Sequence, residues 1–545
     1  MNDKQNNENN QSGILQRIAE ASGFGKVEDK TLEMIGDPPE NRGNRFCVSI
    51  SDIHLTDGTV GFQNLSNYTW DAFYGTIRQH CINYHIDEVV LVLDGDIVDM
   101  IRSSKWAENN IYPWQRKKTV EFSSVVNTII KDIVEKEHSY FFNWLQNLEK
   151  KLKDDDQTNV KHVKIVVLLG NHDKELFCDQ QALNYFYEKG LGRKISKITK
   201  KEREGLSCMY SGGKDMFTDT KQAPYLPFYY GDKGFRFFTT HGQWRDKDNS
   251  NSVKAKDGKP GWTAIDDGWN IETWQQLKFS PFLLPCFGDT VAAGVLSTFI
   301  YKVKKKLKEA EYKDQRLNCI LDELDLYRPT YAAVTRILDE TSDMRTEERK
   351  HEAIKIIEET LYECITDWLS WPYTYQSSPF FRCVGLKLFK RILETMKSLG
   401  HGLEITAIAG LMRTLAFFNR YHRPGISFSK MKKFPSFMPA YRHYKFQIHG
   451  EGHTHQPLQE EPNFSGDHPS TYINFGTWRD QILPRKKHGY RRRGVLRALF
   501  ILDIVNKTET AKEMPRSFDY FVEDVIHWGD FKDAMGKMGR AEPKT

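Results

Sequence analysis

The fold is decided by the stretch FCVSISDIH at 46–54, in which an apolar run from Phe46 to Ile50 leads directly into Asp52 and His54. A continuous apolar run of this length is typical of a strand that is buried on both faces of a sheet. In α/β sheets, chemically active residues usually follow the carboxyl ends of such strands. The stretch therefore predicts a buried strand that carries two polar side chains to one edge of a sheet.

The same arrangement recurs along the chain. Further apolar runs occupy 89–93, 165–169, 235–238 and 446–448. Each run precedes residues of the kinds that bind metal ions, namely Asp94-Gly95-Asp96, Gly170-Asn171-His172-Asp173, His241-Gly242 and Gly452-His453-Thr454-His455. Two later runs, Thr471–Phe475 and Val495–Ile504, are predicted to complete a second sheet.

Length and composition limit the class of protein. At about 150 residues per domain, 545 residues suggest several domains. Aromatic residues make up 13%, which is too many for a disordered chain. The 78 Lys and Arg residues nearly balance the 73 Asp and Glu residues, so composition alone demands no nucleic-acid partner. The eight cysteines form no C-x-x-C pair and are not spaced like a disulfide framework.

The ends of the chain and its longest apolar segment bear on location. Residues 1–13 are polar and lack the apolar core of a secretory signal. No run approaches the roughly 18 consecutive apolar residues of a membrane-spanning helix, since the nearest candidate, Phe279–Val303, contains Pro285. We expect a cytoplasmic protein, with peripheral contact to a membrane as an open alternative.

Changes in pattern divide the chain into five parts. These are a polar N-terminal tail (1–42), the first part of an α/β core (43–242), an inserted helical domain (243–445), the second part of the core (446–510) and a C-terminal tail (511–545). One helix near Phe518–His527 is predicted in the C-terminal tail.

Helical periodicity supports this division. In the insertion, apolar residues recur at spacings of three and four from Ile354 to Trp368 and again from Phe389, and Gly400 is expected to end the second helix. In the first part of the core, one amphipathic helix is predicted over 119–151.

The polar clusters occur in a fixed order: Asp-x-His, Gly-Asp-x-x-Asp, Gly-Asn-His-Asp, His-Gly and Gly-His-Thr-His. In this order, each after a predicted strand, they resemble the calcineurin-like metallophosphoesterase superfamily over about 43–242 and 446–505. The resemblance implies an α/β fold, a four-layer α-β-β-α metallophosphoesterase sandwich, here with a large helical insertion. It also implies a hydrolase with two divalent metal ions.

The resemblance assigns the metal ligands residue by residue. The first ion would take Asp52, His54 and His455, the second would take Asn171, His241 and His453, and Asp96 would bridge them. Two cations about 3.5–4 Å apart acidify a bridging water, which attacks the phosphorus, and they neutralise the phosphoryl oxygens. Mixed imidazole and carboxylate ligands suit Mn²⁺, with Fe, Zn or Co as alternatives.

Three further residues receive roles that do not involve a metal ion. His172 would lie beside the scissile phosphate and protonate the leaving oxygen. Asp173 would orient His172, although capping a helix explains this aspartate equally well. Asp99 is expected either to support a ligand or to lie in the first turn of the next helix.

Details of the motifs indicate a branch of the superfamily. Met100 follows Asp99 where protein Ser/Thr phosphatases have Arg, so a protein phosphatase is disfavoured. The stretch from Ser51 to Leu55 and the insertion after His241 are similar to UDP-2,3-diacylglucosamine pyrophosphohydrolase-like bacterial proteins. Those proteins have Arg where this chain has His172, and their insertion is smaller, so the substrate stays open.

The expected function is hydrolysis of a phosphodiester or pyrophosphate bond in a small or lipid-linked substrate, with the insertion as a lid. A nuclease or nucleotide phosphodiesterase with the same metal centre is the alternative, and a non-catalytic scaffold is a third. The basic stretch Arg485–Arg493 either meets phosphates or forms an exposed hairpin tip. Phe279–Ile300 and the lysines of 302–308 either contact a lipid or membrane surface or form a core helix. The oligomeric state is left open.

Overall fold

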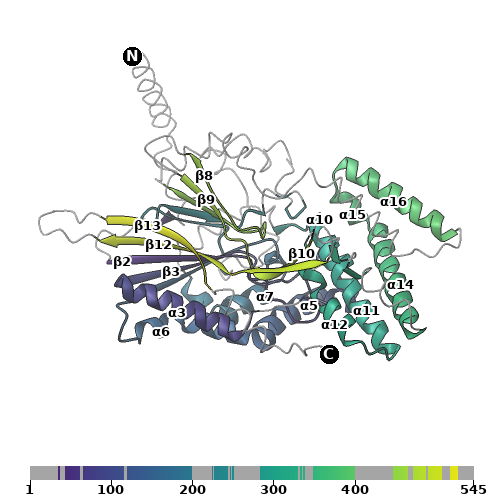
Figure 1. Ribbon diagram of the computed structural model, residues 1–545, viewed down its shortest axis with the longest axis horizontal. Helices are drawn as coiled ribbons and strands as arrows, with labels where there is room; N and C mark the ends of the chain where they lie inside the picture. Colours follow the sequence, from purple (N-terminus) through teal and green to yellow (C-terminus); the bar gives the residue numbers. More distant parts are fainter. Residues whose placement is uncertain are drawn as a thin grey trace, which may run out of the picture.

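The structure, a computed structural model, is a mixed α/β protein with two mixed β-sheets (Figure 1). The residues that it describes are 35–36, 43–61, 65–115, 119–198, 224, 226–243, 246, 248–250, 283–328, 332–333, 336–337, 348–398, 446–463, 470–485, 489–505 and 516–525.

The first sheet has five strands in the order β13-β12-β2-β3-β4. Their bounds are β2 Asn44–Ile50, β3 Ile86–Asp94, β4 His162–Leu168, β12 Arg497–Val505 and β13 Arg516–Asp524. β2, β3 and β4 are parallel to one another, whereas β12 runs antiparallel to both β2 and β13. The carboxyl ends of the three parallel strands therefore share one edge, where the first three polar clusters lie.

The second sheet has six strands in the order β1-β5-β6-β7-β9-β8. Their bounds are β1 Ile35–Gly36, β5 Tyr229–Asp232, β6 Phe237–Thr240, β7 Ile448–Glu451, β8 Leu458–Asn463 and β9 Ser470–Asn474. β6 and β7 are parallel neighbours, although 448 lies far from 240 in the chain. This pairing brings the His-Gly cluster next to the Gly-His-Thr-His cluster.

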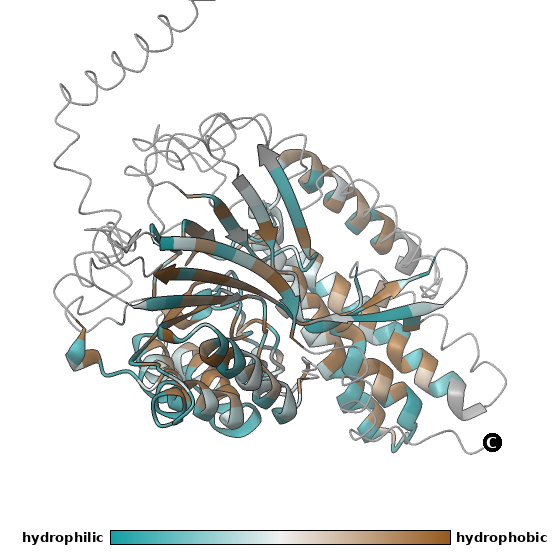
Figure 2. Cartoon of the chain, turned by 60° about the vertical axis from the view of Figure 1, so that its left-hand side comes forward, coloured by the Kyte–Doolittle hydropathy of each residue, from teal (hydrophilic) through white to brown (hydrophobic). Residues whose placement is uncertain are grey.

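The two sheets pack face to face through a largely apolar layer. Cys47 and Val90 of the first sheet share a buried cluster with Phe237 and Ile473 of the second. Figure 2 shows hydrophobic segments, in brown, on the strands at the centre of the molecule. The opposite face of the first sheet is covered by helices α3 (Asn67–Asn83), α5 (Val120–Lys131) and α6 (Ser139–Lys153). The second helical layer of the predicted sandwich stays a prediction.

Two expectations about the strands were wrong. Val495–Ile504 was expected in the second sheet, but β12 pairs with β2 of the first. The helix expected near Phe518–His527 is instead strand β13, so part of the predicted C-terminal tail belongs to the core. The reason is a period of two: Phe518, Tyr520 and Val522 pack against the layer between the sheets.

The helix predicted over 119–151 is three elements. Thr119 caps α5 by accepting a hydrogen bond from the N–H of Phe122 at 3.2 Å. A π-helical turn, η2 (Asp132–Glu137), and His138 then separate α5 from α6. The shorter helices of the core are α4 Lys105–Glu108, η3 Lys174–Cys178, α7 Gln180–Tyr185, η4 Phe186–Gly190 and η5 Ile195–Lys197.

The described parts of 243–445 beyond 283 are helical, as predicted, and lie at one end of the molecule (Figure 1). The helices are α10 Phe287–Asp289, η11 Thr290–Ser297, α11 Thr298–Glu309, α12 Gln315–Glu323, η12 Leu324–Leu326, α14 Glu348–Ser370, α15 Pro372–Gln376 and α16 Phe380–Ser398. Their apolar residues, including Ile357 and Phe389, form a second buried cluster, which also contains Val60 and Ile482 from outside the insertion. Gly400 lies outside the described residues.

A hairpin joins the insertion to the core. Its strands are β10 (Thr477–Pro484) and β11 (Tyr490–Val495). Tyr327 forms a β-bridge with Ile482 of β10. The described residues of the basic stretch are therefore part of a hairpin, which was one of the two alternatives for it, and residues 486–488 lie outside the described ranges.

The apolar segment after Leu283 is largely a core segment. Phe299 and Ile300 are buried, and Lys302 pairs with Glu363 of α14 at 2.7 Å. Phe279 and its immediate successors are outside the described residues. No helix in the described ranges is long and apolar enough to cross a membrane.

Candidate metal centre

The loops after β2 and β3 run side by side and carry the first ligands. The N–H groups of Asp52 and His54 donate to the carbonyls of Gly95 and Asp96, at 3.1 and 2.8 Å. This backbone pairing continues the parallel register of the two strands beyond their ends. As a result Asp52, His54 and Asp96 are held on one side of the sheet edge, and all three are buried.

The backbone at these positions is unusual. Asp52, His54, Asp96, His453 and His455 all have positive φ, between 51° and 66°. Positive φ is rare for residues other than glycine and is concentrated at functional sites. Five of the seven predicted ligands thus have a backbone conformation that is rare for their residue types.

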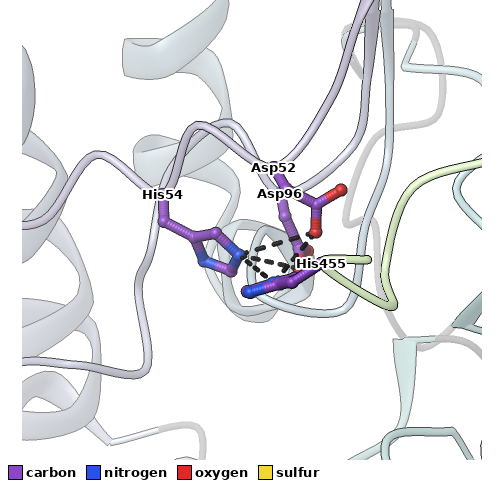
Figure 3. Close-up of side chains that lie close together, drawn as sticks. All are labelled: Asp52, His54, Asp96 and His455. Carbon is purple, nitrogen blue, oxygen red and sulfur yellow. Dashed lines mark hydrogen bonds and ion pairs between the residues drawn. The ribbon is translucent and has the colours of Figure 1, made fainter. Parts of the chain in front are cut away.

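Asp52, His54, Asp96 and His455 form the first group (Figure 3). His54 Nε2 lies 2.9 Å from His455 Nε2 and 3.6 Å from Asp96 Oδ2. His455 Nε2 lies 3.1 Å from Asp52 Oδ1. Ligand atoms about 2.1 Å from one ion lie about 3.0–3.4 Å apart in octahedral or tetrahedral coordination. The spacing therefore fits a single ion.

The second group consists of Asp96, His241 and His453, with Asn171 beside them. His241 Nε2 lies 3.2 Å from Asp96 Oδ2, and Asn171 Oδ1 lies 2.8 Å from His453 Nδ1. Asp96 Oδ2 is also the atom that faces His54 in the first group. One carboxylate oxygen thus lies between both groups, as a bridging ligand requires.

Hydrogen bonds behind the rings fix which nitrogen faces the centre. His54 Nδ1 lies 3.1 Å from Asp99 Oδ2, His241 Nδ1 lies 2.8 Å from the carbonyl of Asp94, and His453 Nε2 lies 3.1 Å from Asp246 Oδ2. Each of these nitrogens carries the proton, because its neighbour only accepts. When the rings are neutral, the opposite nitrogens therefore present lone pairs to the centre, as metal-bound imidazoles do.

Two buried atoms of the described site form no hydrogen bond of good geometry, although each lies 3.1 or 3.2 Å from one of the other predicted ligands. They are Asp52 Oδ1 and His241 Nε2. A buried polar atom without a good hydrogen bond is costly, and both atoms are predicted metal ligands. The converging acceptors and these two atoms fit a pair of cations, so the residues present suit the metal centre that the sequence predicted.

The electrostatics of the site point the same way. Burial lowers the pKa of His455 to about 3, which keeps its ring neutral and able to bind a metal. Burial also acts to lower the pKa of His241, but Asp96 and Asp52 outweigh it and raise this pKa to about 10. The potential at the centre is therefore negative and favours positive charge.

His172 lies at the rim of the first group. Its ring packs edge-on against His54 at 4.7 Å, and its side chain is 12% exposed. Its Nδ1 lies 2.8 Å from Asp99 Oδ1, which leaves Nε2 for an incoming molecule. Burial lowers the pKa of His172 below its ordinary value.

The role predicted for Asp173 was wrong. Its carboxylate accepts hydrogen bonds from the N–H groups of Asp96 (2.7 Å), Gly170 (2.8 Å) and Val98 (2.9 Å), and from no group of His172. It does not cap the following helix with its side chain either. Burial, reinforced by Asp96, raises the pKa of Asp173 to about 7. Asp173 therefore shapes the loops, and Asp99 is the residue that orients His172.

Sequence reasoning missed one residue and undervalued another. Asp246, which supports His453, was not singled out, although it closely follows His241-Gly242. Asp99 was left between two roles, and it is bonded to both His54 and His172. Only the spacing of Gly-Asp-x-x-Asp could have signalled Asp99.

The chain was compared with known proteins. No protein-family model matches it, and no curated protein matches it. The assignment of a function therefore depends on the residues and their geometry.

Proposed function

We propose that this chain is a dinuclear-metal phosphoesterase of the calcineurin-like metallophosphoesterase superfamily, with the four-layer sandwich of that superfamily. It hydrolyses a phosphodiester or pyrophosphate bond in a small or lipid-linked substrate. One observation carries the proposal: the carboxylate of Asp96 lies between two buried groups of imidazoles and carboxylates, with His172 beside them.

The roles of the residues follow from their positions. Two divalent cations, Mn²⁺ being preferred, supply an acidified water and charge neutralisation when bound. Asp52, His54 and His455 hold one, Asn171, His241 and His453 hold the other, and Asp96 bridges them. Asp99 accepts a hydrogen bond from Nδ1 of His172 and stabilises the imidazolium form of this ring, in which Nε2 carries the proton that is given to the leaving oxygen.

The insertion is proposed to act as a lid that selects the substrate, and it is the part that would touch a lipid. Its first described segment offers little for this purpose, since Phe299 and Ile300 are buried. The exposed apolar side chains of the described insertion lie chiefly on α16 and are Phe380, Phe381, Val384, Leu388 and Ile392.

A nuclease or nucleotide phosphodiesterase remains the alternative. It would need free cations beside the centre to bind a nucleic-acid backbone. In the β10–β11 hairpin, Arg492 is engaged by Asp480 at 2.8 Å and Arg493 by Gln481 at 2.6 Å. These contacts favour a structural role for two of the hairpin arginines.

The test is hydrolysis of bis-p-nitrophenyl phosphate against p-nitrophenyl phosphate, with Mn²⁺ supplied and EDTA as the control. We expect a preference for the diester that EDTA abolishes. His172→Ala should lower turnover by about 100-fold or more with unchanged metal content, because it removes only the proton donor. Asp96→Asn should lose metal, measured by mass spectrometry of the dialysed protein.

Three results would count against the proposal. A monoester preference would indicate a phosphatase, and full activity in His172→Ala would remove the role of that residue. No metal bound and no turnover in the wild type would favour the non-catalytic scaffold.

A further inference from the structure

Three arginines from distant parts of the chain meet beside the metal centre. Arg102 follows β3, Arg479 lies on β10, and Arg328 belongs to the insertion, just after η12. Arg479 and Arg102 both approach Asp325 Oδ2, Arg102 at 3.9 Å. Arg328 Nη1 donates to the carbonyl of Asp325 at 2.6 Å. Asp325 and Arg328 thus place the insertion against the edge of the centre.

This arginine cluster (Arg102, Arg328 and Arg479) is linked to the proposed proton donor. Arg102 Nη1 donates to Asp99 Oδ2 at 3.0 Å, and the other oxygen of Asp99 holds the ring of His172. Arg328 is close enough to His455 to act on its charge. The cluster therefore lies on the side of the centre from which His172 would serve the leaving group.

The arrangement around Arg328 favours an anion. Within the described part of the chain, its guanidinium donates only through Nη1, to the carbonyls of Asp325 and Tyr327, and it forms no ion pair. Arg328 is half-buried, and burial together with the charges of Arg102 and Arg479, which Asp325 and Asp99 offset only in part, lowers its pKa to about 9. A cation held next to two others without its own carboxylate is costly, and a bound anion would offset this cost.

We propose that Arg328, with Arg102 and Arg479, binds a second phosphoryl group of the substrate, so that the preferred bond is a pyrophosphate. The proposal rests on the function proposed above. A guanidinium fork matches two oxygens of a phosphoryl group. In the reaction, water gives up a proton to the solvent as its oxygen bonds to one phosphorus, and the bridging P–O bond breaks. His172 gives a proton to the released oxygen, so that two monoesters form.

Two dinucleotides provide a matched test. Diadenosine pyrophosphate has two phosphoryl groups between its adenosines, and adenylyl-(3′→5′)-adenosine has one. We expect the Mn²⁺-loaded enzyme to prefer the pyrophosphate. Arg328→Met should lower the ratio of the two kcat/KM values by about 30-fold, since a charge-assisted hydrogen-bond pair is lost. Arg328→Lys, which keeps the charge without the fork, should fall between.

The control is Arg391→Met, because Arg391 is an exposed arginine on α16, and its ratio should equal that of the wild type. An unchanged ratio in Arg328→Met, or a wild type that prefers the single phosphoryl group, would overturn the second subsite while leaving the phosphoesterase intact.

A binding measurement separates this proposal from the activity. Calorimetric titration of metal-free full-length protein with inorganic pyrophosphate should show binding that weakens about 10-fold or more in Arg328→Met. If neither the dinucleotides nor bis-p-nitrophenyl phosphate is hydrolysed, the proposed function fails, and this titration still decides the anion site. Equal affinity in both proteins, or none in either, would reject it.

Discussion

At the scale of single residues, the centre depends on glycines that leave no room for a side chain beside the carboxylates. A Cβ on Gly170 would lie 2.1 Å from Asp96 Oδ1, and one on Gly452 would lie 2.3 Å from Asp52 Oδ2. The glycines of the motifs thus let the loops approach the carboxylates. The ligands themselves take the strained conformation, at about 1–3 kcal/mol per residue.

Gly170→Ala tests this contact. The added methyl group should displace Asp96, so we expect the protein to lose at least one of two bound metal ions and most of its turnover. Metal content after dialysis measures the effect. Gly75→Ala is the control, because Gly75 lies on the exposed face of α3 with nothing within 4 Å of an added Cβ. It should keep its metal and gain up to about 1 kcal/mol of stability. Full metal content in Gly170→Ala would contradict the assignment of Asp96.

Asp99→Asn tests the carboxylate that holds two imidazoles. An amide in this place brings one N–H group towards a protonated ring nitrogen, so either His54 or His172 must turn. We expect metal affinity and turnover each to fall by about 10–100-fold, as is usual when a partner behind a ligand is removed. Competition with a fluorescent chelator measures the affinity. Asp71→Asn, an exposed aspartate of α3, should change neither.

At the scale of elements, the two sheets are joined at the end away from the centre by one arginine. Arg45, at the start of β2, is bonded to Glu88 of β3 at 3.0 Å, Asp232 of β5 at 2.8 Å and Asp503 of β12 at 3.4 Å. All four side chains are buried. Without the arginine, the three buried carboxylates would lose the cation that they share, and Asp503 would keep its ion pair with Arg516.

Arg45→Met should therefore lower the free energy of unfolding by about 3–5 kcal/mol, measured with denaturant at neutral pH. Lys161→Met is the matched control, because the Lys161–Asp87 pair has a lysine side chain that is 69% exposed. It should cost less than about 1 kcal/mol. A similar small loss in both variants would show that the buried network does not hold the sheets together.

The sequence predicted strands well where burial on both faces requires a continuous apolar run. The apolar runs of β2, β3 and β4 are buried on both faces, and each is a strand in the expected place. β12 was assigned to the wrong sheet because an apolar run shows that a strand is buried but not which strand lies beside it. β13 was read as a helix because its alternation is short.

The candidate site was likewise predicted only in part. All seven predicted ligands are brought together, because the order of motifs places them at the ends of neighbouring strands. The partners of His172 and His453 were not predicted correctly. They depend on how Asp99, Asp173 and Asp246 turn within loops, and nothing in the spacing of the sequence specifies this.

At the scale of the whole molecule, the insertion is attached to the motif that carries His172. Lys174 Nζ lies 2.6 Å from Asp289 Oδ1 of α10, and both side chains are buried. A movement of the insertion would thus displace Lys174, which is two residues from His172. The proposed lid therefore contacts the centre in two places, through the Lys174–Asp289 ion pair and through Arg328.

The stability of the whole chain should depend on pH through His138. This residue lies between η2 and α6 and its Nε2 donates to the carbonyl of Thr56 at 2.9 Å. Burial lowers its pKa from 6.5 to about 4. A lowered pKa means stability that is present above pH 6.5 and is lost as the pH falls towards 4. The expected loss is about 2 kcal/mol between pH 7 and pH 5.

The measurement is unfolding by urea at both pH values in EDTA, which removes any effect of metal binding. His138→Gln keeps a donor for Thr56 but has no group that titrates, so its stability should fall by about 2 kcal/mol less than that of the wild type. An equal fall in both proteins would place the titrating group elsewhere.

The ligands of the first group lie far apart in the chain, since His455 follows His54 by 401 positions. A ribosome that adds about 5–20 residues per second needs about 20–80 s to cover that distance. With the ligand sets proposed here, neither ion has its full set until translation has passed the Gly-His-Thr-His motif. Tight metal binding would then mark a chain as translated beyond His455, and a chain stopped earlier would keep carboxylates at the sheet edge with no ion to neutralise them.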